Sequence, residues 1–177
     1  MALLKIARMG HPVLLARAEE VADPTSPAVA RLVDDMIETM LDADGIGLAA
    51  PQVHVGLRVF VFHLPAERNG GVALPPTAVI NPVLDFFDPE IVPRWEGCLS
   101  IPGLRAQVPR HARLRYTGLD RHGEPIGIEA DGLHGNVVQH EYDHLDGVLY
   151  PMRVTDFSSF GFNEELARFP RRPEEAA

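Results

Sequence analysis

The 177-residue chain has a single cysteine, Cys98, and no long apolar run. One cysteine cannot form an intramolecular disulfide, which excludes a disulfide-built secreted domain. No segment approaches the roughly 20 apolar residues that a membrane-spanning helix needs. The N-terminal stretch MALLKIARMGHPVLLARAEEV is interrupted too often by charge and proline to be a signal peptide. We therefore expect a cytoplasmic protein with no membrane partner.

The chain also has few basic residues relative to acidic ones. The chain has 16 Lys and Arg residues against 25 Asp and Glu residues, a formal net charge of −9. Nucleic acids and anionic membranes both require a basic face, so direct binding to either is not expected. Five arginines nevertheless fall close together in the sequence, and we interpret them as a solvated strand edge. They are Arg105, Arg110, Arg113, Arg115 and Arg121.

The length predicts a single domain over residues 1–177, with a disordered tail over about residues 165–177. Ser26 as a cap and Pro27 at the first helical position predict the start of a helix. Its apolar residues fall at helical spacing, so one face is expected in the core. They are Val29, Leu32, Val33, Met36, Ile37, Met40 and Leu41.

Several short strands are expected after this helix, followed by a second helix over about residues 132–145 with Asp131 as its cap. Residues 120–123 predict a hairpin turn between two of the strands. The pattern is typical of an α+β fold. We predict a mostly antiparallel, curved sheet wrapped around the second, central helix, with one N-terminal amphipathic helix.

The strongest chemical signal is an H-E-x-x-H pattern at residues 140–144 of the second helix. His140 and His144 lie one turn apart on the same helix face, where both can bind one metal ion. Glu141 is turned by about 100° from His140, so its carboxylate can reach a water molecule on the metal without binding the ion. The pattern predicts a hydrolytic site. The alternative is a surface helix that carries two histidines by chance.

A catalytic site of this type has three protein ligands and one open position. Cys98 is the best candidate for the third ligand, because a thiolate suits zinc or ferrous iron and Gly97 lets the backbone approach closely. Taken alone, this cysteine could equally be a small buried apolar residue. Six other histidines have no partner at useful spacing and are expected at the surface or in satisfied core positions. They are His11, His54, His63, His111, His122 and His134.

A third segment, GIGLAAPQ at residues 45–52, is rich in glycine and alanine. It is no dinucleotide fingerprint, because no strand precedes it and the third glycine is missing. Small residues indicate a backbone that something approaches closely. Gln52 is the one polar side chain in the segment, and in isolation it is best interpreted as a surface amide.

Together, GIGLAAPQ (45–52), EGCLS (96–100) and QHEYDHLDG (139–147) resemble the three signature motifs of peptide deformylases, in this order and at these separations. The resemblance extends over roughly residues 5–155. It implies a metal-dependent hydrolase that removes the N-formyl group from the initiator methionine of nascent polypeptides and releases formate. N-formyl-methionyl nascent peptides are the implied partners, with transient proximity to the ribosome.

The resemblance also implies the catalytic roles. Cys98, His140 and His144 would bind one divalent ion per chain, Fe²⁺ in cells, with Zn²⁺, Ni²⁺ or Co²⁺ able to replace it. Glu141 would be the general base and then the acid for a metal-bound water or hydroxide that attacks the formyl carbon. The oxyanion would be held by two hydrogen-bond donors, the side-chain amide of Gln52 and the backbone N–H of Leu99.

Substrate binding is implied at further positions. Ile46 and Gly47 would pair with the peptide backbone as an added strand, close to Gly97. Apolar side chains would form the methionine pocket, with Ile46, Leu133 and Val137 as candidates, and Arg105 matches a family arginine near the site. Two residues depart from the family pattern, Gly135 and Asn136. Asn136 lies one turn before His140, so we expect it to line the pocket or its rim.

Two rival functions remain open from the residues themselves. H-E-x-x-H alone is compatible with a zincin-type metalloendopeptidase, whose third ligand would lie downstream at Glu164 or Glu165. The other rival is a binding module with a structural metal, which would need a closed site with four protein ligands.

Overall fold

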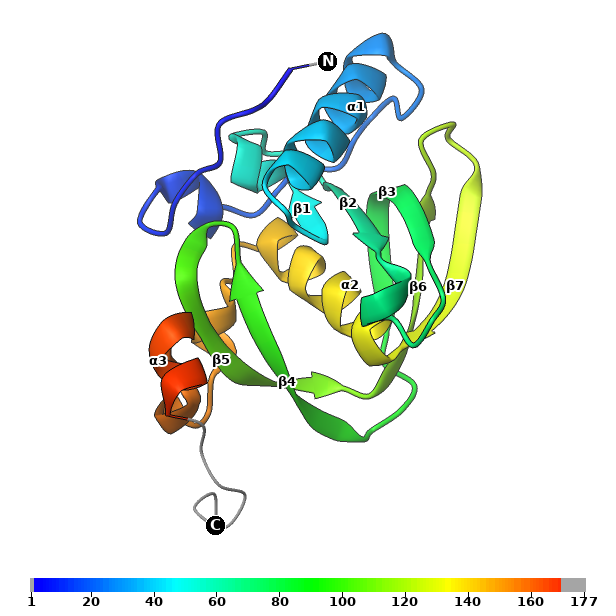
Figure 1. Ribbon diagram of the computed structural model, residues 1–177. Coiled ribbons are helices and arrows are strands. Elements are labelled where there is room, and N and C mark those ends of the chain that lie inside the picture. Colours follow the sequence, from blue (N-terminus) through cyan, green and yellow to red (C-terminus); the bar gives the residue numbers. More distant parts are fainter. Residues whose placement is uncertain (1, 170–177) are drawn as a thin grey trace.

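The structure is a computed structural model that describes residues 2–169 (Figure 1). It has an α+β fold, as the sequence predicts, with three α-helices among these residues: α1 (Pro27–Asp42), α2 (Gly132–Leu145) and α3 (Asn163–Arg168). The strands are β1 (Gly47–Ala49), β2 (Val59–Leu64), β3 (Leu74–Asp85), β4 (Ile91–Cys98), β5 (Ile101–His111), β6 (Arg113–Leu119), β7 (Pro125–Asp131) and β8 (Gly161–Phe162).

The strands form two antiparallel sheets, whereas the sequence predicts one. The larger sheet has the order β1-β2-β3-β6-β7 and the smaller has the order β4-β5-β8. Strands β1 and β4 are therefore both edge strands. Helix α2 contacts β1, β2, β6 and β7 of the larger sheet and β5 of the smaller one. Figure 1 shows α2 between the strands of the two sheets.

Helix α1 begins where the sequence predicts. Ser26 is the N-cap residue and its Oγ accepts a hydrogen bond from the Val29 N–H, while Pro27 is the first helical residue. Four of the predicted core residues are buried, namely Val29, Val33, Met36 and Met40. Leu41 is an exception because its side chain is exposed. The buried face packs against β1 and β2.

Helix α2 also has its predicted limits, but its cap differs from the expectation. Asp131 occupies the N-cap position, yet its side chain makes no capping hydrogen bond. Gly132 follows with a φ of 53°, a conformation that favours glycine. A Cβ atom on Gly135 would lie only 3.2 Å from the Ala130 carbonyl oxygen. Glycine at position 135 therefore lets the start of α2 pack closely against the end of β7.

The end of the described chain differs from the prediction of a disordered tail. Residues 163–168 form α3, and Leu166 packs closely over Gly161 of β8. The short β8 pairs with β5 through Leu104 and Arg105. The rest of the predicted tail, residues 170–177, lies outside the described residues. Over residues 2–169, none of the helices is both long and apolar enough to pass through a membrane.

Candidate metal centre

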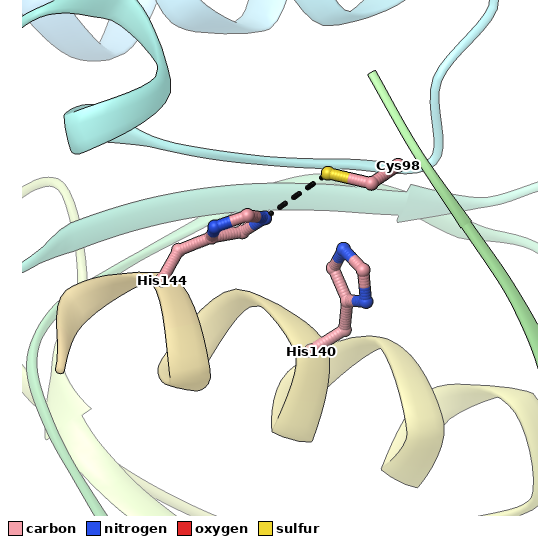
Figure 2. Close-up of side chains that lie close together, drawn as sticks. All are labelled: Cys98, His140 and His144. Atoms are coloured by element: carbon pink, nitrogen blue, oxygen red, sulfur yellow. Dashed lines mark hydrogen bonds between the residues drawn. The ribbon is translucent and has the colours of Figure 1, made fainter. Parts of the chain in front are cut away.

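The three predicted metal ligands lie together. Cys98 ends β4, and His140 and His144 project from α2 towards its sulfur (Figure 2). Their candidate ligand atoms all lie within 4.8 Å of one another, and the Cys98 Sγ is 3.3 Å from the His144 Nε2. Within residues 2–169 this is the one group of side chains that could hold a metal ion. One thiolate and two imidazoles suit zinc and ferrous iron.

The Glu96 carboxylate fixes the orientation of the His140 ring. Its Nδ1 lies 2.7 Å from Oε2 of Glu96, which leaves Nε2 for the centre of the cluster. Burial disfavours the charged imidazole, but Cys98 and Glu96 outweigh burial and raise the pKa of His140 well above its usual value. Histidines that bind metals commonly donate their second nitrogen to a carboxylate in this way. The hydrogen bond to Glu96 therefore fits a ligand role for His140, whose Nε2 would release its proton when a metal binds there.

His144 lies in a different electrostatic environment. Burial, together with the positive charges of His140 and Arg110, lowers the pKa of His144 well below its usual value. The ring is therefore neutral near pH 7, which is the form that can donate a nitrogen lone pair to a metal. Its Nδ1 is buried and has no hydrogen-bond partner in the part of the chain described.

A buried ion-pair network supports the Glu96–His140 pair. Arg110 donates to both carboxylate oxygens of Glu96, at 2.7 and 3.0 Å, and to Oδ2 of Asp143 at 2.7 Å. Arg153 makes two further bonds to Asp143, each of 2.6 Å. Our interpretation of Arg110 as part of a solvated strand edge is wrong, because its side chain is only 4% exposed. Arg113 and Arg121 are exposed as expected.

The Cys98 sulfur accepts hydrogen bonds from the chain itself. The Ser100 N–H and the Gln52 side-chain amide both donate to Sγ at 3.4 Å. Gln52 also donates to the Ser100 Oγ, and its Oε1 accepts from the Ala49 N–H. Gln52 is only 1% exposed, so the interpretation of this residue as a surface amide is wrong. These bonds hold the amide beside the candidate ligand.

Glu141 is buried beside the cluster. Burial raises the pKa of Glu141 to about 7; the charge of His140 opposes this rise and that of Glu96 adds to it. Its Oε2 has no hydrogen-bond partner among the described residues. A Cβ on Gly47 would collide with Oε1 of this carboxylate and would lie 2.8 Å from its Cδ. The small residue at position 47 thus makes room for the chain's own glutamate.

A cavity of about 490 Å³ opens beside these groups, between β1, β4 and α2. All the predicted site residues line it except His144 and Arg105. The lining residues among them are Ile46, Gly47, Gln52, Gly97, Cys98, Leu99, Leu133, Asn136, Val137, His140 and Glu141. The guanidinium of Arg105 instead lies over the Trp95 ring, 5.0 Å from its centroid.

Several residues at the site were not predicted. Trp95, Glu96 and Leu104 line the cavity, as do Asp44, Arg68 and Asn163. A signal existed for Glu96 alone: a histidine ligand usually needs a carboxylate behind it, and this one lies two residues before Cys98. The other lining residues lie in segments that reach the cavity only in the folded chain, so no local sequence pattern indicates them.

The rival ligands do not join the cluster. Glu164 and Glu165 are exposed in α3 and are not part of the candidate metal group. His134, the least certain of the other histidines, instead contacts the Tyr116 hydroxyl at 3.1 Å and packs beside Phe62. Over residues 2–169 only three protein ligands gather, which disfavours a closed structural site.

Comparisons with known proteins show the family to which the chain is related. A family profile described as polypeptide deformylase matches residues 3–159. Peptide deformylase 2 of Ralstonia nicotianae (strain ATCC BAA-1114 / GMI1000) is 49% identical over 172 residues, which cover 95% of each chain. The structure of peptide deformylase from Thermotoga maritima is 36% identical, with a TM-score of 0.80 over 88% of this chain and 100% of that one.

A further solved structure is that of class I type b peptide deformylase from Acinetobacter baumannii with Met-Ala-Ser bound. It is 32% identical, with a TM-score of 0.81 over 86% of this chain and 99% of that one. The family profile and the Ralstonia relative both extend over most of the sequence. The chain therefore belongs to the peptide deformylase family of enzymes.

Proposed function

We propose that the chain removes the N-formyl group from the initiator methionine of nascent polypeptides and releases formate. The observation that carries this proposal is the Cys98, His140 and His144 cluster, together with the buried Glu141 carboxylate, which lines the same cavity as Cys98 and His140. Cys98, His140 and His144 would hold one divalent ion, which we propose is Fe²⁺. When bound, such an ion supplies Lewis-acid polarisation of a carbonyl group and lowers the pKa of water.

Glu141 would move the proton. Its carboxylate would accept a proton from the attacking water molecule and later deliver that proton to the leaving amine. The products are then formate and a peptide with a free amino group. Two observations support this role: the carboxylate lines the cavity, and a pKa raised to about 7 suits a group that must both accept and release a proton near neutral pH.

Gln52 and Leu99 would stabilise the oxyanion that forms when water adds to the formyl carbon. Hydrogen-bond donors that are already in place at such an oxygen lower the barrier by about 3 kcal/mol each. The Gln52 amide is held by its bonds to Ala49 and Ser100 and lines the cavity. Leu99 follows Cys98 directly and also lines it, so its N–H is a suitable second donor.

The peptide would bind as an added strand. β1 and β4 are edge strands of different sheets, and residues of both line the cavity. Main-chain hydrogen bonds from Ile46, Gly47 and Gly97 would hold many different sequences, because they do not depend on side-chain identity. Ile46, Leu133 and Val137 would enclose the methionine side chain. The relative from Acinetobacter baumannii was solved with Met-Ala-Ser bound, a peptide that begins with methionine.

The two sheets would curve around α2 and so keep the cluster shielded between them. N-formyl-methionyl nascent peptides would be the partners, which brings the enzyme transiently near the ribosome.

The direct test is formate release from a formyl-Met-Ala-Ser peptide. Protein loaded with Fe²⁺ without oxygen, or with Ni²⁺, should release one formate per peptide, and the metal-free protein should release none. Elemental analysis must show bound metal in the same sample. Bound metal without formate release above the metal-free control would overturn the proposal.

A further inference from the structure

The N-terminal segment, residues 2–9, is held in place by its backbone N–H groups. The Ala2 N–H donates to a carboxylate oxygen of Asp35, and the Leu4 N–H donates to the hydroxyl oxygen of Thr39, so the first half of the segment lies against α1. Figure 1 shows the chain continuing from there towards the turn between β4 and β5. Among residues 2–9 a single side chain is buried, so backbone hydrogen bonds largely set the course of the segment.

The second half of the segment bonds to the candidate site. The Ala7 N–H donates to the Gln52 carbonyl oxygen at 2.7 Å, and the Met9 N–H donates to the Ser100 carbonyl oxygen at 2.9 Å. The two acceptor residues are also joined to each other, because the Gln52 side-chain amide donates to the Ser100 hydroxyl at 3.1 Å. Both residues are only 1% exposed. The N-terminal segment therefore bonds to both members of one buried amide–hydroxyl pair.

The two members of this pair come from opposite sides of the cavity. Gln52 lies in the short 3-10 helix that follows β1 of the larger sheet, whereas Ser100 lies in the turn between β4 and β5 of the smaller sheet. In the part of the chain described, β1 pairs with β2 and β4 pairs with β5, so no strand pairing joins β1 to β4. The N-terminal segment, which bonds to both sides, bridges the gap that the two sheets leave open.

The position of Ser100 determines where the Gln52 amide points. The amide oxygen is held by the Ala49 N–H, and the amide nitrogen carries two hydrogens. One hydrogen is directed to the Ser100 hydroxyl, which leaves the other on the side of the Cys98 sulfur, 3.4 Å from the nitrogen. A shift of Ser100 would turn this second N–H away from the metal centre.

We propose that the N-terminal segment is a positioning element for the oxyanion donor. This inference rests on the proposed function. The Ala7 and Met9 N–H groups fix the separation of Gln52 and Ser100, and so hold the Gln52 amide where the oxyanion forms. None of residues 2–9 lines the cavity, so the segment acts through Gln52 and not on the peptide. Its loss should lower kcat with little change in KM, because the amide acts on the transition state.

Met9 is the position at which this connection can be removed with least disturbance. A His11 N–H bond to the Arg8 carbonyl oxygen closes a turn over residues 8–11, and its third residue, Gly10, is the one with a positive φ, 103°. This is characteristic of a type II turn, in which proline is common at the second residue. Met9→Pro therefore suits the turn and removes the N–H that bonds to the β4–β5 turn.

The first measurement is the kinetics of formate release from formyl-Met-Ala-Ser, with metal content determined in each sample. Met9→Pro should lower kcat by about tenfold, with KM and metal content near the wild-type values. Met9→Ala retains the N–H and loses only an exposed side chain, so kcat should return to the wild-type value. In a Gln52→Ala background Met9→Pro should have no further effect, because the amide that it displaces is absent.

The second measurement uses metal-free protein and does not depend on activity. Nuclear magnetic resonance follows the exchange of the Gln52 side-chain amide protons with water, and the loss of their signals in Gln52→Ala identifies them. The exchange should be slow in the wild-type protein and in Met9→Ala, because the amide is buried and hydrogen-bonded. It should become faster in Met9→Pro.

Failure of the inference is distinct from failure of the proposed function. A metal-loaded wild-type protein that releases no formate contradicts the function, whereas the exchange measurement tests the segment separately. Unchanged amide exchange in a folded Met9→Pro protein overturns the inference, as does an equal loss of kcat with and without Gln52. If Met9→Pro does not fold, the wild-type backbone decides: the Ala7 and Met9 N–H groups should be protected from exchange, and free exchange at both overturns the inference.

Discussion

The Nδ1 atom of His140 lies 2.7 Å from Oε2 of Glu96, and the Glu96 carboxylate is held in turn by two hydrogen bonds from Arg110. This chain of contacts links β4, β5 and α2 behind the candidate metal centre. It fixes the direction of the His140 ring before any ion binds. The metal centre therefore depends on residues that would not touch the ion.

Replacing the carboxylate of Glu96 should weaken metal binding without removing a ligand. Glu96→Gln keeps the shape of the side chain but loses the charge that orients and polarises the His140 ring. Loss of such a partner typically lowers metal affinity by about 10–100-fold. Competition against a chelator of known affinity measures the change.

The matched control for this experiment is Glu129→Gln. The Glu129 side chain is exposed on β7, and its Oε2 makes only a long, 3.9 Å contact with Nη2 of Arg113, which is exposed as well. This variant should bind metal as tightly as the wild-type protein. Equal affinities for Glu96→Gln and Glu129→Gln would show that the buried carboxylate does not support the site.

The same carboxylate should make the metal-free protein sensitive to acid. Burial alone would raise the pKa of Glu96, but its hydrogen bonds to His140 and Arg110 outweigh burial and lower it from 4.5 to about 2. The folded pKa lies below the unfolded one, so the stabilisation is complete above about pH 4.5 and is lost as the pH falls towards 2. A shift of this size corresponds to roughly 3 kcal/mol in the free energy of unfolding.

Urea denaturation of the metal-free protein between pH 5 and pH 2.5 would measure this loss. In Glu96→Gln the free energy of unfolding should change less over the same range, because the group at position 96 no longer titrates. Parallel curves for the two proteins would argue against the low pKa of Glu96.

The local parts of this structure could be predicted because short-range chemistry determines them. The Ser26 cap with Pro27 sets the start of α1, and the H-E-x-x-H spacing places two imidazoles on one face of α2. Cys98 could be paired with them because a two-histidine site lacks a third ligand. The family motifs added Gln52 and Leu99, and both line the cavity.

What the sequence did not indicate depends on contacts between distant residues. Strand β4 contains Pro93, which argues against a central strand but is tolerated here because β4 is an edge strand. Arg110 lies 14 residues from Glu96 and 33 from Asp143, so only the fold makes it a buried ion pair. A run of arginines gives no local signal that one of them turns inwards.

Glycine at position 47 should be essential for the position of Glu141. In Gly47→Ala the added Cβ would collide with the Glu141 carboxylate, so the carboxylate or β1 must move. A displacement of the proton-transferring group by about 1 Å can lower the rate by about 100-fold. Steady-state kinetics of formate release, together with metal analysis, would measure the effect.

Gly56→Ala provides the control for this substitution, because a Cβ on Gly56 would meet nothing within 4 Å. It should leave both activity and metal content near the wild-type values. If Gly47→Ala were as active as Gly56→Ala, the close contact with Glu141 would have no catalytic consequence.

Removing the Glu141 carboxylate should separate metal binding from turnover. Glu141→Ala leaves Cys98, His140 and His144 in place, so the metal content should stay near that of the wild-type protein. Formate release should fall by about 100- to 10,000-fold, the usual contribution of a positioned acid–base group. Turnover within a few-fold of the wild-type rate would assign the proton transfer to another group.

The central claim is that the Cys98 sulfur and the two imidazoles share one ion. Cobalt substitution tests it most directly, because a cobalt–thiolate bond gives an absorption band in the near ultraviolet that nitrogen and oxygen ligands do not. The metal-free protein titrated with Co²⁺ should develop this band and reach its end point at one ion per chain, and Cys98→Ser should bind Co²⁺ more weakly and without the band. A wild-type protein that binds Co²⁺ with no thiolate band, or a Cys98→Ser protein that binds it as tightly as the wild type, would contradict the account.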